Sequence, residues 1–320
     1  MSAILPVDFV ERLDHGIHVV DTGFVRPRYD AAYLIVENGR AAFVDTGTNH
    51  AVPRLLAALG AAGLEPEAVD MVIPTHVHLD HAGGAGLLMQ HLPRARLVVH
   101  PRGARHLVDP AQLVAGATAV YGAEEMERSY GTPVGVAAER VTTTADGMTL
   151  ELAGRPLLFL DTPGHALHHH CIWDERSRSF FTGDTFGTSH RELDTARGAF
   201  VMPTTPPTQF QPEALRRSIE RLLAFSPRRM LLTHYGAVED VPRLAELFLA
   251  QMDEMVAAAR PLARVPDRHA ALKRALEALH MRRLREHGVA LPEGRILDLL
   301  GLDFELNAQG IAIWLDRTGT

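Results

Sequence analysis

The residues of this 320-residue chain that are best suited to chemistry are histidines and aspartates gathered in residues 75–84 (THVHLDHAGG). His76 and His78 are two positions apart on extended chain, so their side chains point to one side and can bind the same ion. Asp80 and His81 follow where the chain bends, and they can face a second ion about 3.5 to 4 Å away, the usual spacing of two-metal hydrolytic sites. Imidazole and carboxylate suit zinc, iron or manganese. Because the chain has one cysteine, a closed structural zinc site built on thiolates is disfavoured.

One short segment cannot fill the coordination spheres of two ions, so further ligands must come from other parts of the chain. Three residues of suitable type stand at the ends of predicted strands, in the motifs DTPGH, TGD and LTH: they are His165, Asp184 and His234. Residues that leave separate strands at one edge of a sheet lie close together in space. The sequence therefore predicts a metal centre at a sheet edge.

The elements that must position these residues are predicted from hydrophobic periodicity and turn residues. The segment 33–45 consists of two apolar runs joined by Asn38-Gly39, the strongest short hairpin signal. We expect further strands over 69–74, 97–100, 169–173, 179–182 and 230–233, and a second hairpin over 147–162. Apolar residues at helical spacing predict helices over 49–60, 86–92, 212–225, 241–260 and 269–287, and the last 80 residues are expected to be mainly helical.

Five motifs in order, VDTG (residues 44–47), THVHLDHAGG, DTPGH, TGD and LTH, resemble the metallo-β-lactamase superfamily over residues from about 16 to 236, in its glyoxalase II or lactonase-like branch. The resemblance implies an α/β fold, an αββα sandwich with its metals at one edge of the paired sheets. We expect residues 1–236 to form this catalytic domain. Residues 237–320 are expected to form a helical extension packed on it, because about 80 residues would be marginal as a separate domain.

The resemblance also assigns the ligands of two metal ions. A first ion would be bound by His76, His78 and His165, a second by Asp80, His81 and His234, and Asp184 would bridge the two. Asp45 of VDTG matches a family position that supports the site by accepting hydrogen bonds without binding metal. A turn-forming aspartate at a strand end is the other interpretation of Asp45, and the two are compatible.

The chain departs from the family pattern directly after DTPGH. Relatives commonly place Gly-His after two further residues, whereas here His168 stands where glycine is usual and His169 takes the position of the second histidine. This predicts His169 as a packing or supporting residue of the site. His168 and His170, on the opposite face of the strand, are expected at the surface.

Two divalent ions that share a water lower its pKa from near 16 towards about 7, which provides a hydroxide at neutral pH. Asp80 and Asp184 place negative charge beside this water and could move its proton. Tyr235 is a candidate hydrogen-bond donor to the developing oxyanion, with packing at a strand end as the alternative. His190 and Arg191 are candidate substrate contacts or else ordinary solvated loop residues.

The predicted function is that of a dinuclear metallo-hydrolase that cleaves a small ester, lactone or thioester. Iron-dependent redox chemistry is the competing class, but in dinuclear relatives of that kind a glutamate replaces the second histidine of the motif, and this chain keeps His78 there. A phosphodiesterase or an RNA-processing nuclease is disfavoured, because the chain has a formal net charge of −7 and no extended basic segment near the motifs.

We expect the cofactors to be two divalent metal ions, zinc first, with iron and manganese as alternatives. The only cysteine, Cys171, and the lack of a recognisable export signal at the N-terminus predict a cytoplasmic protein. The expected partner is a small-molecule substrate, with no nucleic acid and no membrane, and a homodimer is left open. The C-terminal helices could line the substrate pocket or form the dimer contact.

Overall fold

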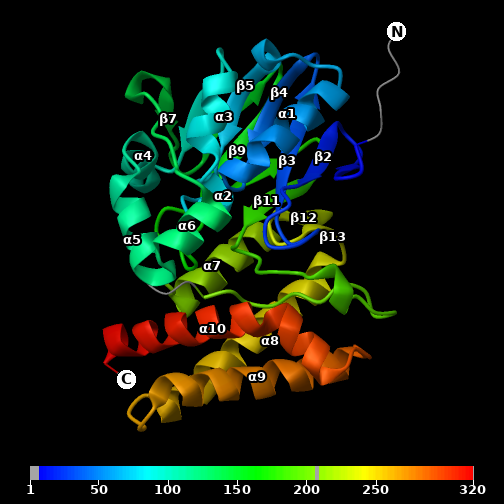
Figure 1. Cartoon of the computed structure of the whole chain (residues 1–320). Helices are drawn as coiled ribbons and strands as arrows, with labels where there is room; N and C mark the ends of the chain where they lie inside the picture. The colour runs from blue at the N-terminus through cyan, green and yellow to red at the C-terminus, as the bar shows by residue number, and fades with distance from the viewer. Residues whose placement is uncertain (1–6, 206–208, 320) are drawn as a thin grey trace. The chain divides into compact units, whose positions relative to one another are not determined.

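The computed structural model describes residues 7–205 and 209–319 (Figure 1). Contacts within the chain divide it into two compact units. The first unit consists of Met1–Asp161, His168–Gly183 and Pro227–Ala237, and the second of Thr162–Leu167, Asp184–Ser226 and Val238–Thr320. The second unit therefore takes in two earlier segments besides residues 238–320. The packing of the predicted extension, residues 237–320, on a catalytic domain stays a prediction.

The first unit contains a seven-stranded sheet whose strands follow one another in chain order. Its strands are β1 (Val10–Arg12), β2 (Ile17–Asp21), β3 (Ala31–Glu37), β4 (Arg40–Val44), β5 (Val69–Ile73), β6 (Arg96–Val99) and β7 (Val141–Thr143). Strands β1 to β4 are antiparallel, and β4 to β7 are parallel. Asn38 and Gly39 join β3 to β4 with φ of 46° and 75°, which confirms the predicted two-residue turn.

A second sheet has six strands in the order β13-β12-β11-β10-β9-β8. They are β8 (Met148–Leu152), β9 (Arg155–Asp161), β10 (His170–Asp174), β11 (Ser179–Gly183), β12 (Arg229–Leu232) and β13 (Gly236–Val238). Strands β8 to β11 are antiparallel neighbours, and β12 lies parallel to β11. The predicted second hairpin and the three predicted strands that follow it are therefore confirmed.

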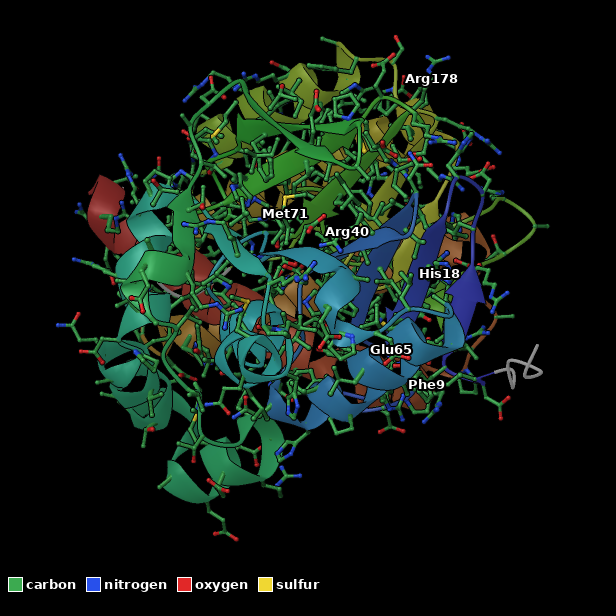
Figure 2. The ribbon with its side chains drawn as sticks, turned by 90° about the horizontal axis from the view of Figure 1, so that it is seen from above. Phe9, His18, Arg40, Glu65, Met71 and Arg178 are labelled. Atoms are coloured by element: carbon green, nitrogen blue, oxygen red, sulfur yellow. The ribbon has the colours of Figure 1, made fainter. Side chains whose placement is uncertain are left out.

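The two sheets pack face to face through a hydrophobic cluster (Figure 2). Tyr33 and Ile73 of the first sheet meet Phe159 and Phe181 of the second, and Met71 lies among them. A second cluster covers the other face of the first sheet, where residues of helices α1 (Val52–Ala61) and α3 (Ala85–His91) are buried. Burying one side chain of this size contributes about 1.5–3 kcal/mol. The two clusters therefore cover both faces of the first sheet.

The remaining helices of the first unit are α2 (Leu79–Ala82), α4 (Pro101–Val108), α5 (Ala111–Tyr121) and α6 (Ala123–Tyr130). Helix α2 carries two of the predicted ligands, Asp80 and His81. Helices α4 to α6 occupy the segment after β6 (Figure 1).

The second unit is mainly helical. Its helices are α7 (Pro212–Leu223), α8 (Val241–Ala259), α9 (Arg268–His287) and α10 (Glu293–Thr318). Phe200 and Met202, in the loop before α7, pack with Leu284 of α9 and with Leu300 and Phe304 of α10 in a third cluster. The predicted fold class is thus confirmed as α/β with two sheets and a mainly helical C-terminal region. Within the described residues, none of the helices combines the length and the apolar character needed to cross a membrane.

His280 of α9 is a buried titratable group in this helical unit. Its side chain is fully buried, its ring stacks on Phe304, and its Nδ1 lies 3.3 Å from Oε1 of Gln251. Because Nε2 of Gln251 donates to the carbonyl oxygens of Val201 and Leu247, Oε1 is an acceptor and Nδ1 of His280 is the donor. Burial lowers the pKa of His280 to about 4, so the folded protein holds this ring neutral.

We predict that this histidine makes stability fall in acid. Below about pH 6.5 the unfolded chain binds a proton that the folded ring does not, so the free energy of unfolding falls by about 1.4 kcal/mol per pH unit from pH 6.5 towards 4. His280→Asn keeps a donor for Gln251 and does not titrate, so urea unfolding should show a flatter pH dependence. His91→Asn, at the exposed last residue of α3, is the control and should keep the wild-type slope. Equal slopes for wild type and His280→Asn would contradict the prediction.

Candidate metal centre

The ends of three strands bring most of the predicted ligands together in the first unit. Asp45 directly follows β4, Thr75 lies two residues after β5, and Thr233 directly follows β12. Since β4 and β5 are parallel neighbours, their carboxyl ends lie at the same edge of the first sheet. The hydroxyl of Thr233, which follows a strand of the second sheet, donates to Oδ2 of Asp45 at 2.6 Å. Both sheets therefore contribute to one edge of the sandwich.

Asp45 is the fully buried centre of this edge. Its Oδ1 accepts from the backbone N–H of Thr75 at 2.7 Å and from the hydroxyl of Thr75 at 3.0 Å. Its Oδ2 accepts from Nδ1 of His81 at 2.9 Å and from the hydroxyl of Thr233. Asp45 has a left-handed φ of 56°, a conformation that aspartate tolerates better than most residues. The prediction that Asp45 accepts hydrogen bonds beside the site is confirmed.

Asp80, His81 and His234 form a group whose ligand atoms all lie within 4.8 Å of one another. Oδ2 of Asp80 lies 3.8 Å from Nε2 of His81 and 3.4 Å from Nε2 of His234. The far nitrogens of both rings face oxygen acceptors, Asp45 for His81 and the carbonyl of Tyr29 at 3.3 Å for His234. A ring that donates from Nδ1 offers the lone pair of Nε2, so a carboxylate and two imidazole lone pairs converge. This donor set fits a divalent metal ion.

His76 and His78 form a close pair beside this group. Nε2 of His76 lies 2.8 Å from Nδ1 of His78, and the ring centroids are 4.3 Å apart. The ring centroids of His76 and His81 are 4.0 Å apart. His169 is fully buried and stacks on His76 at 4.8 Å, which confirms its predicted packing role.

The expectation that His168 and His170 lie at the surface is wrong. Their exposed fractions are 8 % and 1 %, because the segment enters β10, a strand inside the second sheet whose residues are all buried. Nε2 of His170 donates to the carbonyl of Pro74 at 2.9 Å, and its Nδ1 accepts from the hydroxyl of Thr144 at 3.0 Å. The ring of His168 lies 5.6 Å from that of His78. Burial lowers the pKa of each of these two histidines to about 3.

His165 and Asp184 lie together in the second unit. Nε2 of His165 is 3.3 Å from Oδ2 of Asp184, and both side chains are almost completely buried. Gly164 has a φ of 134° and packs so closely on α7 that a Cβ would lie 2.3 Å from the backbone of Leu215. This contact explains the glycine of DTPGH and sets the position of the following histidine. Five of the seven predicted ligands are thus in the first unit and two in the second.

Of the other predicted site residues, Tyr235 and His190 are buried and Arg191 is half-buried. Tyr235 is 5 % exposed and belongs to the hydrophobic cluster between the sheets, which fits the packing alternative, and its role as an oxyanion donor stays a prediction. His190 is 1 % exposed, with Nε2 3.3 Å from Oδ2 of Asp303 of α10, so it is not a solvated loop residue. The side chain of Arg191 donates to the carbonyl of Ser189.

Sequence reasoning missed two acids that adjoin site histidines. Asp303 is 113 positions after His190, and no local pattern points to it. Asp30 precedes β3 without a motif, yet it is fully buried and its Oδ1 lies 3.8 Å from Nδ1 of His234. Burial raises the pKa of Asp30 to about 7, against the opposing effect of His234 and His81.

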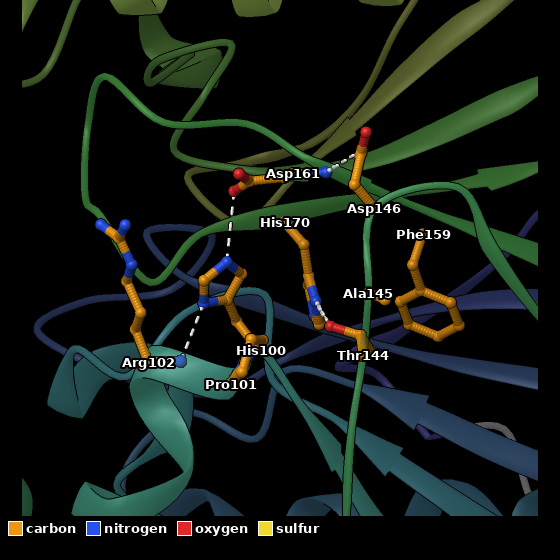
Figure 3. A pocket seen from close by; sticks show the side chains of 9 residues that line it. All are labelled: His100, Pro101, Arg102, Thr144, Ala145, Asp146, Phe159, Asp161 and His170. Carbon is orange, nitrogen blue, oxygen red and sulfur yellow. Dashed lines mark hydrogen bonds and ion pairs between the residues drawn. The ribbon is translucent and has the colours of Figure 1, made fainter.

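A cavity of about 200 Å³ lies in the first unit where β6, β7 and β9 end and β10 begins (Figure 3). Nδ1 of His100 accepts from the backbone N–H of Arg102 at 3.2 Å, so Nε2 is the nitrogen that donates to Asp161, also at 3.2 Å. The cavity is lined by His100, Pro101, Arg102, Thr144, Ala145, Asp146, Phe159, Asp161 and His170. The predicted ligands are not among its lining residues.

Comparison with known proteins places this fold and these motifs in a family. The sequence profile of the metallo-beta-lactamase superfamily matches residues 25–234, and the chain belongs to this superfamily. It is 25 % identical over 251 residues to the metallo-beta-lactamase fold-containing protein ST1585 of Sulfurisphaera tokodaii, covering 74 % of this chain and 84 % of that one. The predicted superfamily is therefore confirmed, and with it a metal-binding fold.

Two further proteins show how far the likeness extends. The hydroxyacylglutathione hydrolase of Salmonella typhi is 29 % identical over 162 residues, which cover 50 % of this chain and 49 % of that enzyme. The chain thus spans about half the length of this relative. The structure of the metallo-beta-lactamase family protein TTHA1429 from Thermus thermophilus matches with a TM-score of 0.65 and 23 % identity, covering 95 % of this chain and 94 % of that one. This match extends the shared fold over nearly the whole chain.

Gly183, the last residue of β11, is closely packed at the sheet edge that holds Asp45 and Thr75. A Cβ there would lie 2.5 Å from Oγ1 of Thr75 and 2.6 Å from Nε2 of His169. We predict that Gly183→Ala lowers the free energy of unfolding by about 1–3 kcal/mol more than the control Gly147→Ala. Gly147 also has a positive φ but no heavy atom within 4 Å of such a Cβ, so it shares only the backbone cost. Urea unfolding of the metal-free proteins measures the difference, and equal losses would disprove the overlap.

Proposed function

We propose that this protein is a dinuclear metallo-hydrolase that cleaves a small ester, lactone or thioester. The observation that carries the proposal is the group formed by Asp80, His81 and His234, in which two histidines present Nε2 to one carboxylate while oxygen acceptors hold their far nitrogens. Two bound ions, zinc in our proposal, would supply a hydroxide at neutral pH and polarise the substrate carbonyl.

We further propose that His165 and Asp184 of the second unit would supply the remaining ligands, as the resemblance to the family assigns them. Chain connectivity supports this assignment. Asp184 directly follows Gly183, the last residue of β11 in the first unit, so their Cα atoms are about 3.8 Å apart. His165 is three residues before His168 of the first unit, which limits their Cα separation to roughly 11 Å. The order of the family motifs supports the same arrangement.

Among the acids of the proposed site, we propose Asp80 for moving a proton, because it is the most exposed of them. Its side chain is 26 % exposed, against 6 % for Asp184 and 1 % for Asp45. A carboxylate that reaches solvent can take a proton from the attacking water and pass it to the leaving group. Asp45, whose oxygens already accept four hydrogen bonds, instead keeps His81 in place. Tyr235 remains our candidate for the oxyanion donor.

Ester, lactone and thioester substrates are favoured over phosphodiesters by the acidic net charge and by the similarity to a hydroxyacylglutathione hydrolase. A substrate with two carboxylates would have to be bound by arginine, because the only lysine, Lys273, pairs with Glu305 on α10. We further propose a small-molecule substrate, no nucleic-acid or membrane partner, and a cytoplasmic location, to which the single buried Cys171 is suited.

Metal analysis and one double variant test the proposed function. Protein purified without added metal should contain close to two divalent ions per chain and hydrolyse members of a panel of lactones, thioesters and aryl esters. His76→Ala combined with Asp184→Asn should lower turnover at least about 10³-fold while the helix content stays unchanged, because both ions lose a ligand. His269→Ala, a half-exposed histidine of α9, should keep wild-type turnover.

Three results would contradict this proposal. Turnover that survives in the double variant would show that the metal ligands do not carry the reaction. A single iron per chain, together with oxygen consumption on a persulfide, would replace hydrolysis by redox chemistry. Phosphodiester cleavage without ester cleavage would reject the proposed substrate class.

A further inference from the structure

A buried acid behind one of the predicted metal ligands has no evident structural purpose. Asp30, the residue before β3 in the first unit, is 0 % exposed. Its Oδ2 accepts from the hydroxyl of Thr22 at 2.8 Å, and the backbone N–H of Thr22 donates to the carbonyl of Asp30 at 3.0 Å. Oδ1, in contrast, has no hydrogen-bond partner within the described part of the chain. A neutral side chain would close the same loop without burying a charge.

The orphan oxygen faces the far nitrogen of His234. Oδ1 of Asp30 lies 3.8 Å from Nδ1 of His234, and the carbonyl of Tyr29 lies 3.3 Å from the same nitrogen. The ring of Tyr29 stands edge-on to the imidazole, with the centroids 5.6 Å apart. The consecutive residues Tyr29 and Asp30 therefore both lie near Nδ1 of His234. Its front nitrogen, Nε2, points to Asp80.

Among the described residues, no arginine or lysine is one of the groups that act electrostatically on Asp30. The charged and titratable groups that act on it are His234, His81 and Asp80, all members of the candidate metal group. Burying a carboxylate is costly unless a cation compensates it. A cationic centre held by His234 would provide that compensation.

A second histidine of the group has the same arrangement. Nδ1 of His81 donates to the buried carboxylate of Asp45, and its Nε2 faces Asp80. A carboxylate behind a ligand histidine fixes the tautomer and makes the ring a stronger ligand. Asp30 stands in the same relation to His234, at a longer distance and directly before β3, whereas Asp45 directly follows β4.

We propose that Asp30 is a positioning residue for the metal ion bound by Asp80, His81 and His234. Its carboxylate keeps the proton of His234 on Nδ1, so that Nε2 carries the lone pair, and it strengthens that ligand electrostatically. This inference rests on the proposed function only in that His234 is a metal ligand. It adds a residue that the family motifs do not contain.

Metal affinity tests the inference without a substrate. Metal-free protein is titrated with Zn²⁺ against a chromophoric chelator, and with Co²⁺ while its visible absorption is recorded. We expect Asp30→Asn to weaken the second ion, the one bound by Asp80, His81 and His234, about 10–100-fold and to leave the first ion unchanged. The Co²⁺ spectrum should change for one of the two equivalents only. The control is Asp21→Asn, the same change at a buried aspartate that contacts Gly23 and Arg54. It should bind both ions as wild type does.

A double-variant cycle separates positioning from a general loss of structure. If Asp30 acts through His234, then Asp30→Asn should weaken the second ion much less in a His234→Ala background than in wild type. An equal effect in both backgrounds would overturn the inference. Should Asp30→Asn fail to fold, Thr22→Val, which releases one carboxylate oxygen and keeps the charge, should weaken the second ion by a smaller factor, and unchanged affinity there would count against Asp30.

The outcomes distinguish this inference from the proposed function. If wild type binds two ions and Asp30→Asn binds them equally well, only the role of Asp30 is overturned. If wild type binds a single ion and Asp30→Asn weakens that ion, the dinuclear hydrolase is rejected and the role of Asp30 stands.

Discussion

The buried carboxylate of Asp45 is the interaction on which the first unit depends. Its two oxygens accept from the backbone and side chain of Thr75, from His81 and from Thr233. These donors follow strand β5, lie on helix α2 and follow strand β12. One side chain thus joins the ends of both sheets to the short helix that carries two of the predicted ligands, Asp80 and His81. Losing it would leave several buried donors unpaired, each of which costs free energy comparable to a hydrogen bond.

The hydrophobic clusters and the polar edge have separate tasks. Apolar side chains between the sheets and under α1 and α3 supply the stability and keep the strands in place. The polar residues lie where strands end, since there the side chains are no longer committed to sheet packing. A stable frame allows charged and strained groups to be held close together, as the left-handed backbone of Asp45 shows. The same frame accommodates His168, His169 and His170, three buried histidines in a row.

Much of this could be predicted because the signals are local. The Asn38-Gly39 turn, the strand before THVHLDHAGG and the helix periodicities depend on neighbouring residues, and the structure confirms them. The errors arise where burial depends on distant segments. The sequence pattern places His170 at the surface, but β9 and β11 enclose its strand in the sheet. The contact between His190 and Asp303 joins residues 113 positions apart, so no local pattern could reveal it.

The sequence by itself determined the superfamily, the order of the elements and the identity of the candidate ligands, because ligand chemistry resides in residue types and their spacing along the chain. Only the tertiary structure decided which nitrogen of each ring faces inward, since this depends on acceptors from other strands, as Asp45 does for His81. It also decided that Asp30 lies behind His234. Whether a carboxylate pairs with an imidazole depends on their distance and burial in the folded chain, and the spacing of residues along the sequence determines neither.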